Sequence, residues 1–384
     1  MADDPEVKEL LKRKGLESAY VHTDELAQMF CRELFLAPPR ASWVIVARTF
    51  PAVKGTMVES TDPDRKEEEI RSAGGVRFPQ KDFPMIGRVE ELDLKTGELA
   101  VRRTFSQVTD LWLPDHLPFR SLKHPLVSGI MAVETFLEAA RLLYPYLSLL
   151  GVRQVKFENI LEVPAGKGRE ARILCRREEE PTQEVRCRVE LSSAGLSPSG
   201  RPLDTWSPNY RGQVILGPRT LPLSFPPDLA ARAEDLDTRP VERGEIEELY
   251  EKSTGLRGRY RVLEKIQGSG PGIIKGTMTY RQGEDIAGMG RTSYLYPPYL
   301  LEALMHLFAF YPALRREKGV GNLIPAGMEE LRFTRPARDG EHLKLEARLC
   351  SRDERGFTWD ARALDENGIT ILQVLSMRMN RFSL

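Results

Sequence analysis

The sequence predicts an α+β fold in which one unit, antiparallel strands around a single long buried helix, occurs twice. Two segments, 129–144 and 299–314, are apolar on nearly every side. A helix that is hydrophobic all round is buried and does not lie on a surface. Each of these segments is preceded and followed by strand-like segments, which indicates a sheet wrapped around a helix. The repeat is one of organisation and not of residue-by-residue identity.

Length and composition exclude several classes of protein. A chain of 384 residues suits two or three domains, with 41% apolar residues for cores and 29% charged residues for a surface. The formal net charge is zero, with 56 residues of each sign. A nucleic-acid-binding protein is expected to show a clear basic excess, so no nucleic-acid partner is predicted.

Cysteine usage and hydropathy predict the cellular compartment. The four cysteines are scattered without CxxC spacing, which argues against a disulfide framework and against a zinc site. The longest apolar run is far shorter than a membrane span, and the N-terminus does not resemble a signal peptide. We therefore expect a cytoplasmic protein with no membrane association.

The first 80 residues are expected to form an N-terminal segment and linker. Helical periodicity is present at 5–14 and 25–35, and 43–46 is typical of a short buried strand. The stretch 51–75 has the composition of a linker. A helix followed by one strand is too little to close a core alone, so we expect this segment to pack on something else or to be the trailing piece of another domain.

The first repeat is predicted to span 81–217. Two strands joined by a Lys-Thr-Gly turn precede the helix at 129–144. Further strands are predicted at 152–157, 170–177, 184–192 and 210–216.

A linker rich in Pro and acidic residues, 218–240, leads to the second repeat at 241–384. A short helix is predicted at 245–252, ahead of the long helix at 299–314. Strands are predicted at 261–267, 273–280, 330–334, 342–351, 357–364 and 370–381.

Two stretches carry the candidate chemistry. His116 closes the stretch Asp-Leu-Trp-Leu-Pro-Asp-His just ahead of the first long helix, a common position for a catalytic base. Glu302 and His306 lie in Tyr-Pro-Pro-Tyr-Leu-Leu-Glu-Ala-Leu-Met-His at the start of the second long helix, one turn apart on one face. We expect the two stretches to meet in space and to share one active site.

Several motifs resemble the dehydratase domain of polyketide and polyunsaturated-fatty-acid synthases. They are Phe-Pro-Met-Ile-Gly at 83–87, Leu-Pro-Asp-His at 113–116, Pro-Leu-Val-Ser-Gly-Ile-Met-Ala-Val-Glu at 125–134 and Pro-Pro-Tyr-Leu-Leu-Glu at 297–302. The resemblance covers roughly residue 83 to the C-terminus and implies a double hotdog, two hotdog units in one chain. The family pairs a histidine of the first hotdog with an acid of the second, which by position are His116 and Glu302. The first 80 residues resemble, less closely, the C-terminal end of a ketoreductase domain.

The sequence departs from the family pattern at three places. The usual spacing from the histidine to the helix requires extra residues after His116, and Ser128 replaces a proline. His124 is therefore a second candidate for the base, although the flanking sequence favours His116. The family's usual acid is Asp, and here it is Glu302. The family's tyrosine-rich stretch before the second hotdog is matched only weakly here, by Gly-Leu-Arg-Gly-Arg-Tyr at 255–260, which ends at Tyr260.

Dehydration of a 3-hydroxyacyl thioester explains why these residue types are needed. A base takes the Cα proton while an acid protonates the departing hydroxide. Imidazole is a base near neutral pH, and a carboxyl in an apolar neighbourhood such as that of Glu302 stays partly protonated. His306 could orient that carboxyl. The helix N-terminus at Ser128 and Gly129 offers backbone N–H groups to the thioester carbonyl.

The predicted function is dehydration of 3-hydroxyacyl chains on an acyl carrier protein to trans-2-enoyl thioesters, without cofactor or metal. The expected partners are that carrier protein, other domains of a synthase and a second copy of the chain in a homodimer. One alternative keeps the fold but isomerises double bonds or closes rings, and another is a catalytically silent binding domain. Each of these residues also has a purely structural interpretation. In that interpretation His116 is a surface-loop residue, His124 is structural, Glu302 caps its helix and Tyr260 is a core residue.

Overall fold

A computed structural model gives the structure of the chain. It describes residues 76, 77, 82–145, 147–178, 184–196, 202–217, 236–317, 320 and 322–382. The chain divides into two compact units, Met1–Gly75 and Val76–Leu384. The expectations for 1–75, including the resemblance to a ketoreductase, lie outside the described residues. The domain boundaries proposed from the sequence stay predictions.

The described strands form a single antiparallel sheet of 13 strands in the order β1-β2-β3-β5-β6-β7-β4-β10-β13-β12-β11-β9-β8. In chain order the strands are β1 (Val76–Arg77), β2 (Arg88–Asp93), β3 (Glu98–Phe105), β4 (Ser148–Phe157), β5 (Arg169–Glu178), β6 (Val185–Leu196), β7 (Pro202–Gly217), β8 (Lys265–Gly270), β9 (Ile273–Thr279), β10 (Asn322–Phe333), β11 (His342–Asp353), β12 (Gly356–Leu364) and β13 (Thr370–Phe382).

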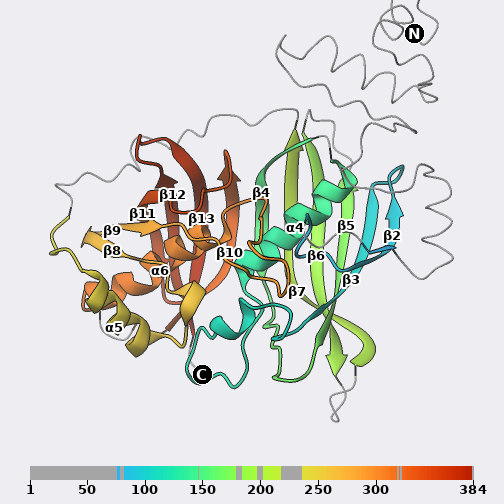
Figure 1. Cartoon of the computed structure of the whole chain (residues 1–384). Coiled ribbons are helices and arrows are strands. Elements are labelled where there is room, and N and C mark those ends of the chain that lie inside the picture. Colours follow the sequence, from blue (N-terminus) through green and yellow to red (C-terminus); the bar gives the residue numbers. More distant parts are fainter. Residues whose placement is uncertain are drawn as a thin grey trace, which may run out of the picture. The chain divides into compact units, whose positions relative to one another are not determined.

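The strand order contains the same topology twice. In the first repeat β2-β3-β5-β6-β7-β4 are neighbours, with the helix α4 (Gly129–Leu143) following β3 in the chain. In the second repeat β8-β9-β11-β12-β13-β10 are neighbours, with α6 (Pro298–Leu314) following β9. Figure 1 shows α4 lying against the strands of the first repeat and α6 against those of the second. The predicted α+β fold with a repeated unit is confirmed.

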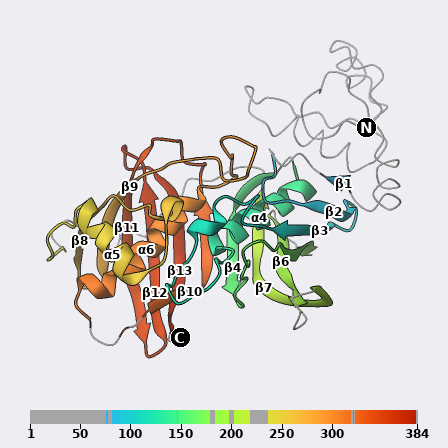
Figure 2. The ribbon, with the colours of Figure 1, turned by 60° about the horizontal axis from the view of Figure 1, so that its bottom comes forward.

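The two repeats join where β4 pairs with β10, with Gly327 opposite Lys156 and Leu331 opposite Val152. Gly327 has a φ of 157°, and a Cβ there would lie 2.3 Å from the carbonyl oxygen of Val155. The close approach of the two backbones therefore excludes a side chain. This seam brings the helices of the two repeats into contact, and the two views in Figures 1 and 2 agree on that arrangement.

Both long helices are buried as their apolar sequences predict. Thirteen residues of α4 are buried. They are all the residues from Ile130 to Leu143 except Arg141, which is half-buried. In α6, Pro298 occupies the first turn, where its missing N–H costs nothing. The predicted bounds, 129–144 and 299–314, agree with the structure to within one residue at each end.

Strand ends differ more from the sequence-based bounds. Strand β4 begins at Ser148 and β10 at Asn322, which is earlier than predicted. Strand β8 begins at Lys265, later than predicted, and four residues without regular structure separate it from the 3-10 turn η4 (Gly258–Tyr260). A strand starts where it begins to pair with a neighbouring strand. The residues of the strand itself do not show which segment that neighbour is.

Shorter elements and surface charges complete the unit. The turn η1 (Leu113–Asp115) precedes His116, and α5 (Arg243–Ser253) precedes η4.

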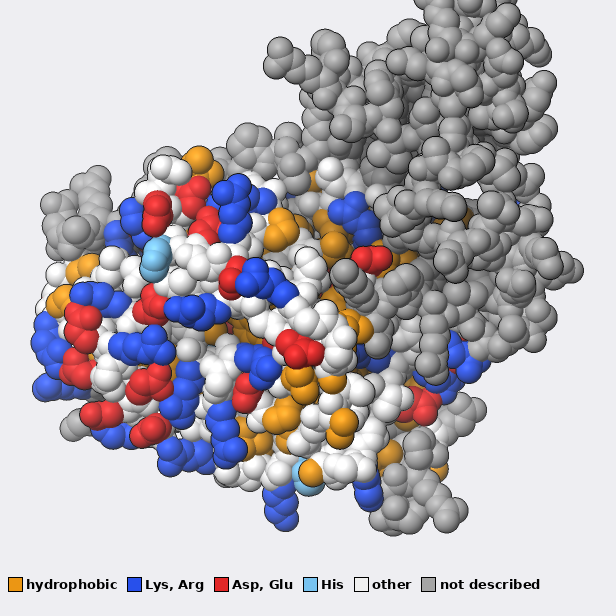
Figure 3. Space-filling model, viewed as in Figure 1, with side chains coloured by type: hydrophobic (Ala, Val, Ile, Leu, Met, Phe, Trp, Pro, Cys, Tyr) orange, Lys and Arg blue, Asp and Glu red, His pale blue; other side chains and the backbone are white. Residues whose placement is uncertain are grey.

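On the face shown in Figure 3, positive and negative side chains are interspersed over the second repeat. Across β11 and β12, for example, Arg362 pairs with Glu346 at 2.7 Å. Among the described residues, no helix is both long and apolar enough to cross a membrane.

Candidate active site

A cavity of about 920 Å³ lies where the two repeats meet. It is lined by the N-terminal end of α4, one face of α6, the end of β4, the C-terminal end of α5 and the first residues of β10. His116 and Glu302 both line it, one from each repeat. The walls are mainly apolar, with side chains such as Phe119, Leu126 and Met305. The cavity can therefore enclose an acyl chain beside a histidine and a carboxyl group.

The tautomer of neutral His116 follows from its hydrogen bond. Its Nδ1 lies 2.8 Å from the carbonyl oxygen of Leu126, which can only accept. The neutral ring must therefore carry its hydrogen on Nδ1, and Nε2 keeps a free lone pair. Burial lowers the pKa of His116 below its ordinary value, while the nearby charge of Glu302 and the hydrogen bond to Leu126 act in the opposite direction. The neutral form of His116 therefore presents Nε2 as the nitrogen that can accept a proton.

The turn before His116 is held to the second repeat by hydrogen bonds. The backbone N–H of Arg259 donates to the Asp115 carboxylate at 3.2 Å and its guanidinium donates to the same carboxylate at 2.9 Å. The N–H of Arg257 donates to the Asp115 carbonyl at 3.0 Å. Gly258 has a φ of 42°, and a Cβ there would lie 2.6 Å from the Asp115 carboxylate, so only glycine leaves room for this contact. Residues of the second repeat therefore hold the backbone turn that carries His116, while the Leu126 carbonyl orients its ring.

Tyr260, the last residue of η4, packs against the His116 ring. The two ring centroids are 4.6 Å apart with an interplanar angle of 43°. The Tyr260 hydroxyl lies 2.7 Å from the Ser128 hydroxyl. Both residues are buried, and neither lines the cavity. Ser128 and Tyr260 therefore support His116 and the start of α4 from behind.

The Glu302 carboxyl is held by one oxygen. The Tyr250 hydroxyl accepts a hydrogen bond from the N–H of Leu263 and is hydrogen-bonded to Nδ1 of His306 at 2.8 Å. Nε2 of His306 is hydrogen-bonded to Oε1 of Glu302 at 2.9 Å. Oε2 of Glu302 is buried and has no hydrogen-bond partner among the described residues. The chain Tyr250–His306–Glu302 leaves this second oxygen available to a substrate.

The N-terminus of α4 also faces the cavity, through Gly129. The first N–H groups of a helix have no intrahelical acceptor, so they can bind a carbonyl oxygen. A Cβ on Gly129 would lie 2.9 Å from the ring of Phe157. The glycine is thus required by the packing of Phe157 on the first turn, a reason that the sequence did not reveal.

The sequence-predicted site residues separate into three groups. His116, Glu302, His306 and Gly129 line the cavity. Ser128 and Tyr260 lie directly behind it. His124 is half-buried and does not line it.

Sequence reasoning missed Tyr250 and Arg259. Tyr250 lies in α5, far from Glu302 in the chain, and no local pattern singles it out. Arg259 stands in the Gly-Leu-Arg-Gly-Arg-Tyr stretch already noted, but its role depends on contacts with Asp115 and Asp285. Within the described part of the chain, no cluster of His, Cys, Asp and Glu side chains is arranged to hold a metal ion.

The sequence matches one family model. Residues 229–383 match the family described as polyketide synthase dehydratase N-terminal domain. The matched region is the second repeat, which carries Glu302 and His306. No curated protein matches the sequence.

Solved structures resemble the chain over both repeats. The dehydratase domain from the CurF module of curacin polyketide synthase has a TM-score of 0.60 at 15% identity, covering 78% of this chain and 99% of its own. A trans-AT polyketide synthase dehydratase domain from Brevibacillus brevis has a TM-score of 0.61 at 12% identity, covering 78% and 98%. An isomerase-inactive variant of GphF DH1 has a TM-score of 0.57 at 23% identity, covering 78% and 97%. The predicted double-hotdog fold is confirmed.

Proposed function

We propose that this chain removes water from 3-hydroxyacyl thioesters carried on an acyl carrier protein. It is similar to the dehydratase domains of polyketide synthases in fold and, over residues 229–383, in sequence. The product is the trans-2-enoyl thioester. The observation that supports this most is the arrangement of His116 and Glu302, which come from different repeats and line one cavity. A neutral imidazole and a carboxyl with one free oxygen are the two groups that such an elimination needs.

The elimination balances with these two groups. Nε2 of His116 takes the proton from Cα, and the electron pair of that bond forms the Cα–Cβ double bond. The Cβ–O bond breaks as Oε2 of Glu302 delivers a proton to the departing hydroxyl, which leaves as water. His116 is then protonated and Glu302 ionised, and a proton passed from one to the other through solvent restores both.

The thioester carbonyl gains negative charge as the Cα proton is removed. We assign its stabilisation to the N–H groups at the start of α4, next to Gly129. This places the carbonyl between the base and the helix N-terminus. The apolar side chains of the cavity then surround the acyl chain.

The test of this function uses a 3-hydroxyacyl chain loaded on an acyl carrier protein, with the mass of the carrier-bound chain as readout. Loss of one water with formation of a trans-2-enoyl thioester is the expected result. A product in which the double bond has moved, or a ring without loss of water, would instead support isomerisation or cyclisation. An unchanged mass over a series of chain lengths would favour a silent binding domain.

The rate of this reaction should depend on pH through His116. Only the unprotonated ring can accept a proton, and burial lowers its pKa below the ordinary 6.5. We therefore expect kcat/KM to rise with pH along an acidic limb whose midpoint lies below 6.5. A pH profile of kcat/KM with the carrier-bound substrate measures this midpoint. A midpoint above about 7 would contradict the assignment of this neutral histidine as the base.

A further inference from the structure

We propose that Glu134 is a positioning residue of this site, because its carboxyl in α4 fixes the backbone that leads into α6 and thereby sets the place of Glu302. The inference rests on the proposed function. The contacts that carry it are called the Glu134 bridge below. They join the Glu134 carboxylate to the N–H of Leu295 at 2.7 Å and to the N–H of Tyr296 at 3.4 Å.

The internal symmetry of the fold relates Glu134 to Glu302. The helices α4 and α6 occupy the same place in the two repeats. Glu134 is the sixth residue of α4, and Glu302 is the fifth residue of α6. Glu302 faces a cavity lined by Leu126 and Val127, which precede α4. Glu134, in contrast, is fully buried and accepts the N–H groups of two residues that precede α6.

A second cross-repeat bond reinforces the Glu134 bridge. The hydroxyl of Tyr296 donates to the carbonyl oxygen of Ile130 at 2.6 Å. Tyr296 is immediately followed by Pro297, the N-cap of α6, so the bonds act on the start of that helix. A helix is stiff over one or two turns, which transmits the position of its first residues to Glu302.

The start of α4 thus serves both halves of the catalytic pair. His116 is oriented by the Leu126 carbonyl, three residues before α4 begins. Glu302 is oriented through Glu134, in the second turn of the same helix. A common support of this kind keeps the separation of base and acid constant, which matters because a misplacement of about 1 Å can reduce a rate about 100-fold.

A buried acid is costly, so its presence in an apolar helix needs a reason. Glu134 is fully buried, and burial raises its pKa to about 8. A leucine at this place would avoid that cost but would leave the N–H groups of Leu295 and Tyr296 without an acceptor. Each unsatisfied buried group costs about 1–3 kcal/mol. The carboxyl therefore stabilises the contact between the repeats.

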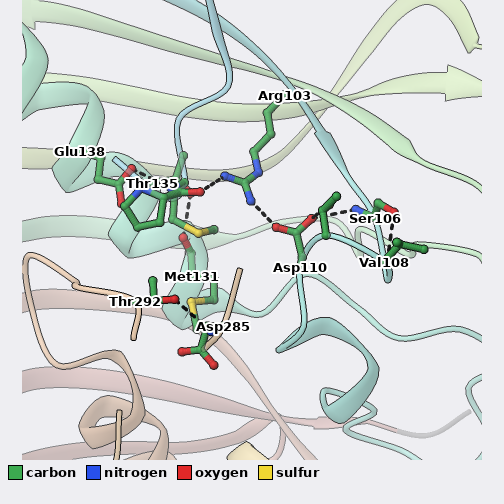
Figure 4. A network of polar contacts seen from close by, with 12 residues as sticks. Arg103, Ser106, Val108, Asp110, Met131, Thr135, Glu138, Asp285 and Thr292 are labelled. Atoms are coloured by element: carbon green, nitrogen blue, oxygen red, sulfur yellow. Dashed lines mark hydrogen bonds and ion pairs between the residues drawn. The ribbon is translucent and has the colours of Figure 1, made fainter. Parts of the chain in front are cut away.

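Glu138, one turn later in α4, is the comparison residue, and it shares a side-chain hydrogen bond with Glu134. It is also fully buried, and burial also raises its pKa. Its carboxylate, however, accepts the N–H of Met85 at 2.8 Å, within the first repeat. Figure 4 shows Glu138 near Arg103, which donates to the carbonyl of Pro84 at 2.5 Å and pairs with Asp110. Removing Glu138 takes away its bond to Met85 and its bond to Glu134, but it leaves Glu134 in place as acceptor for Leu295 and Tyr296. It should therefore destabilise the first repeat with a smaller effect on α6 than removal of Glu134.

The experiment compares Glu134→Leu, Glu134→Gln and Glu138→Leu in the full chain. The substrate is a 3-hydroxyacyl pantetheine thioester, and kcat, KM and the thermal midpoint are measured. We expect Glu134→Leu to lower kcat at least about 10-fold with KM changed less than about 2-fold, because only the position of the acid is altered. Glu134→Gln keeps a carbonyl acceptor and should restore most of kcat. Glu138→Leu should lower the thermal midpoint to a similar extent but lower kcat clearly less than Glu134→Leu does.

Amide hydrogen exchange provides a readout that does not require activity. Exchange at Leu295, Tyr296 and the first turn of α6 should become faster in Glu134→Leu and change clearly less in Glu138→Leu. If Glu134→Leu does not fold, Tyr296→Phe removes the second cross-repeat bond alone and should act in the same direction. Unchanged exchange at these residues, or an equal loss of kcat in both leucine variants, would overturn the role of Glu134. Absence of turnover by the unchanged chain would overturn the proposed function instead, while exchange still decides the Glu134 bridge.

Discussion

Glu302→Gln is expected to lower kcat for water loss by roughly 100-fold or more, since the amide cannot deliver the proton that the departing hydroxyl needs. The substitution keeps the size of the side chain and a carbonyl oxygen that can still accept from His306. The fold should therefore be retained, and KM should change little. Mass analysis of a carrier-bound 3-hydroxyacyl chain over time measures the rate.

Glu302→Asp is the companion variant. It keeps the acid but shortens the side chain by one methylene, so its carboxyl loses contact with either His306 or the substrate. An intermediate rate is expected, above that of Glu302→Gln. Equal rates for the unchanged chain and Glu302→Gln would mean that the carboxyl serves its helix and not the reaction.

His116→Ala should abolish water loss, because it removes the base. Among the described residues, Nε2 of His116 is the only ring nitrogen of a cavity-lining histidine that keeps a free lone pair. His306 also lines the cavity, but both of its ring nitrogens are engaged, by Tyr250 and by Glu302. The loss of a general base typically costs 100-fold to about 10,000-fold in rate. The measurement is again the rate of water loss from a carrier-bound chain.

His124→Ala is the control for that variant. His124 precedes Pro125 and does not line the cavity, so its removal should reduce the rate only modestly. Circular dichroism should show both variants folded. A larger loss for His124→Ala than for His116→Ala would transfer the role of base to His124 and would invalidate the site described above.

Helix α6 illustrates how far local sequence reaches. Its apolar run predicts a buried helix to within one residue, because periodicity and hydropathy are properties of the segment itself. The same run draws attention to Glu302, the one acid among buried apolar residues. The spacing of Glu302 and His306 also predicts that they lie on one face, and the 2.9 Å bond between them agrees.

Glu134 was open to the same reasoning but was not singled out. It is an acid in a helix otherwise apolar on nearly every side, which is the signal that identified Glu302. What the sequence could not supply is its partner, since Leu295 and Tyr296 lie more than 160 residues later. A buried carboxyl can be recognised locally, but its purpose depends on the groups that it meets.

The sequence by itself determined the α+β class, the two buried helices and the histidine and acid that head the candidate site, because each depends on patterns within a single segment. Only the tertiary structure decided that His116 and not His124 lines the cavity, and that Tyr250 supports Glu302 through His306. It alone decided that Phe157 covers Gly129 and that β4 pairs with β10. These features join residues that are far apart in the chain, and the free energy of such contacts belongs to the packed pair and not to either local segment.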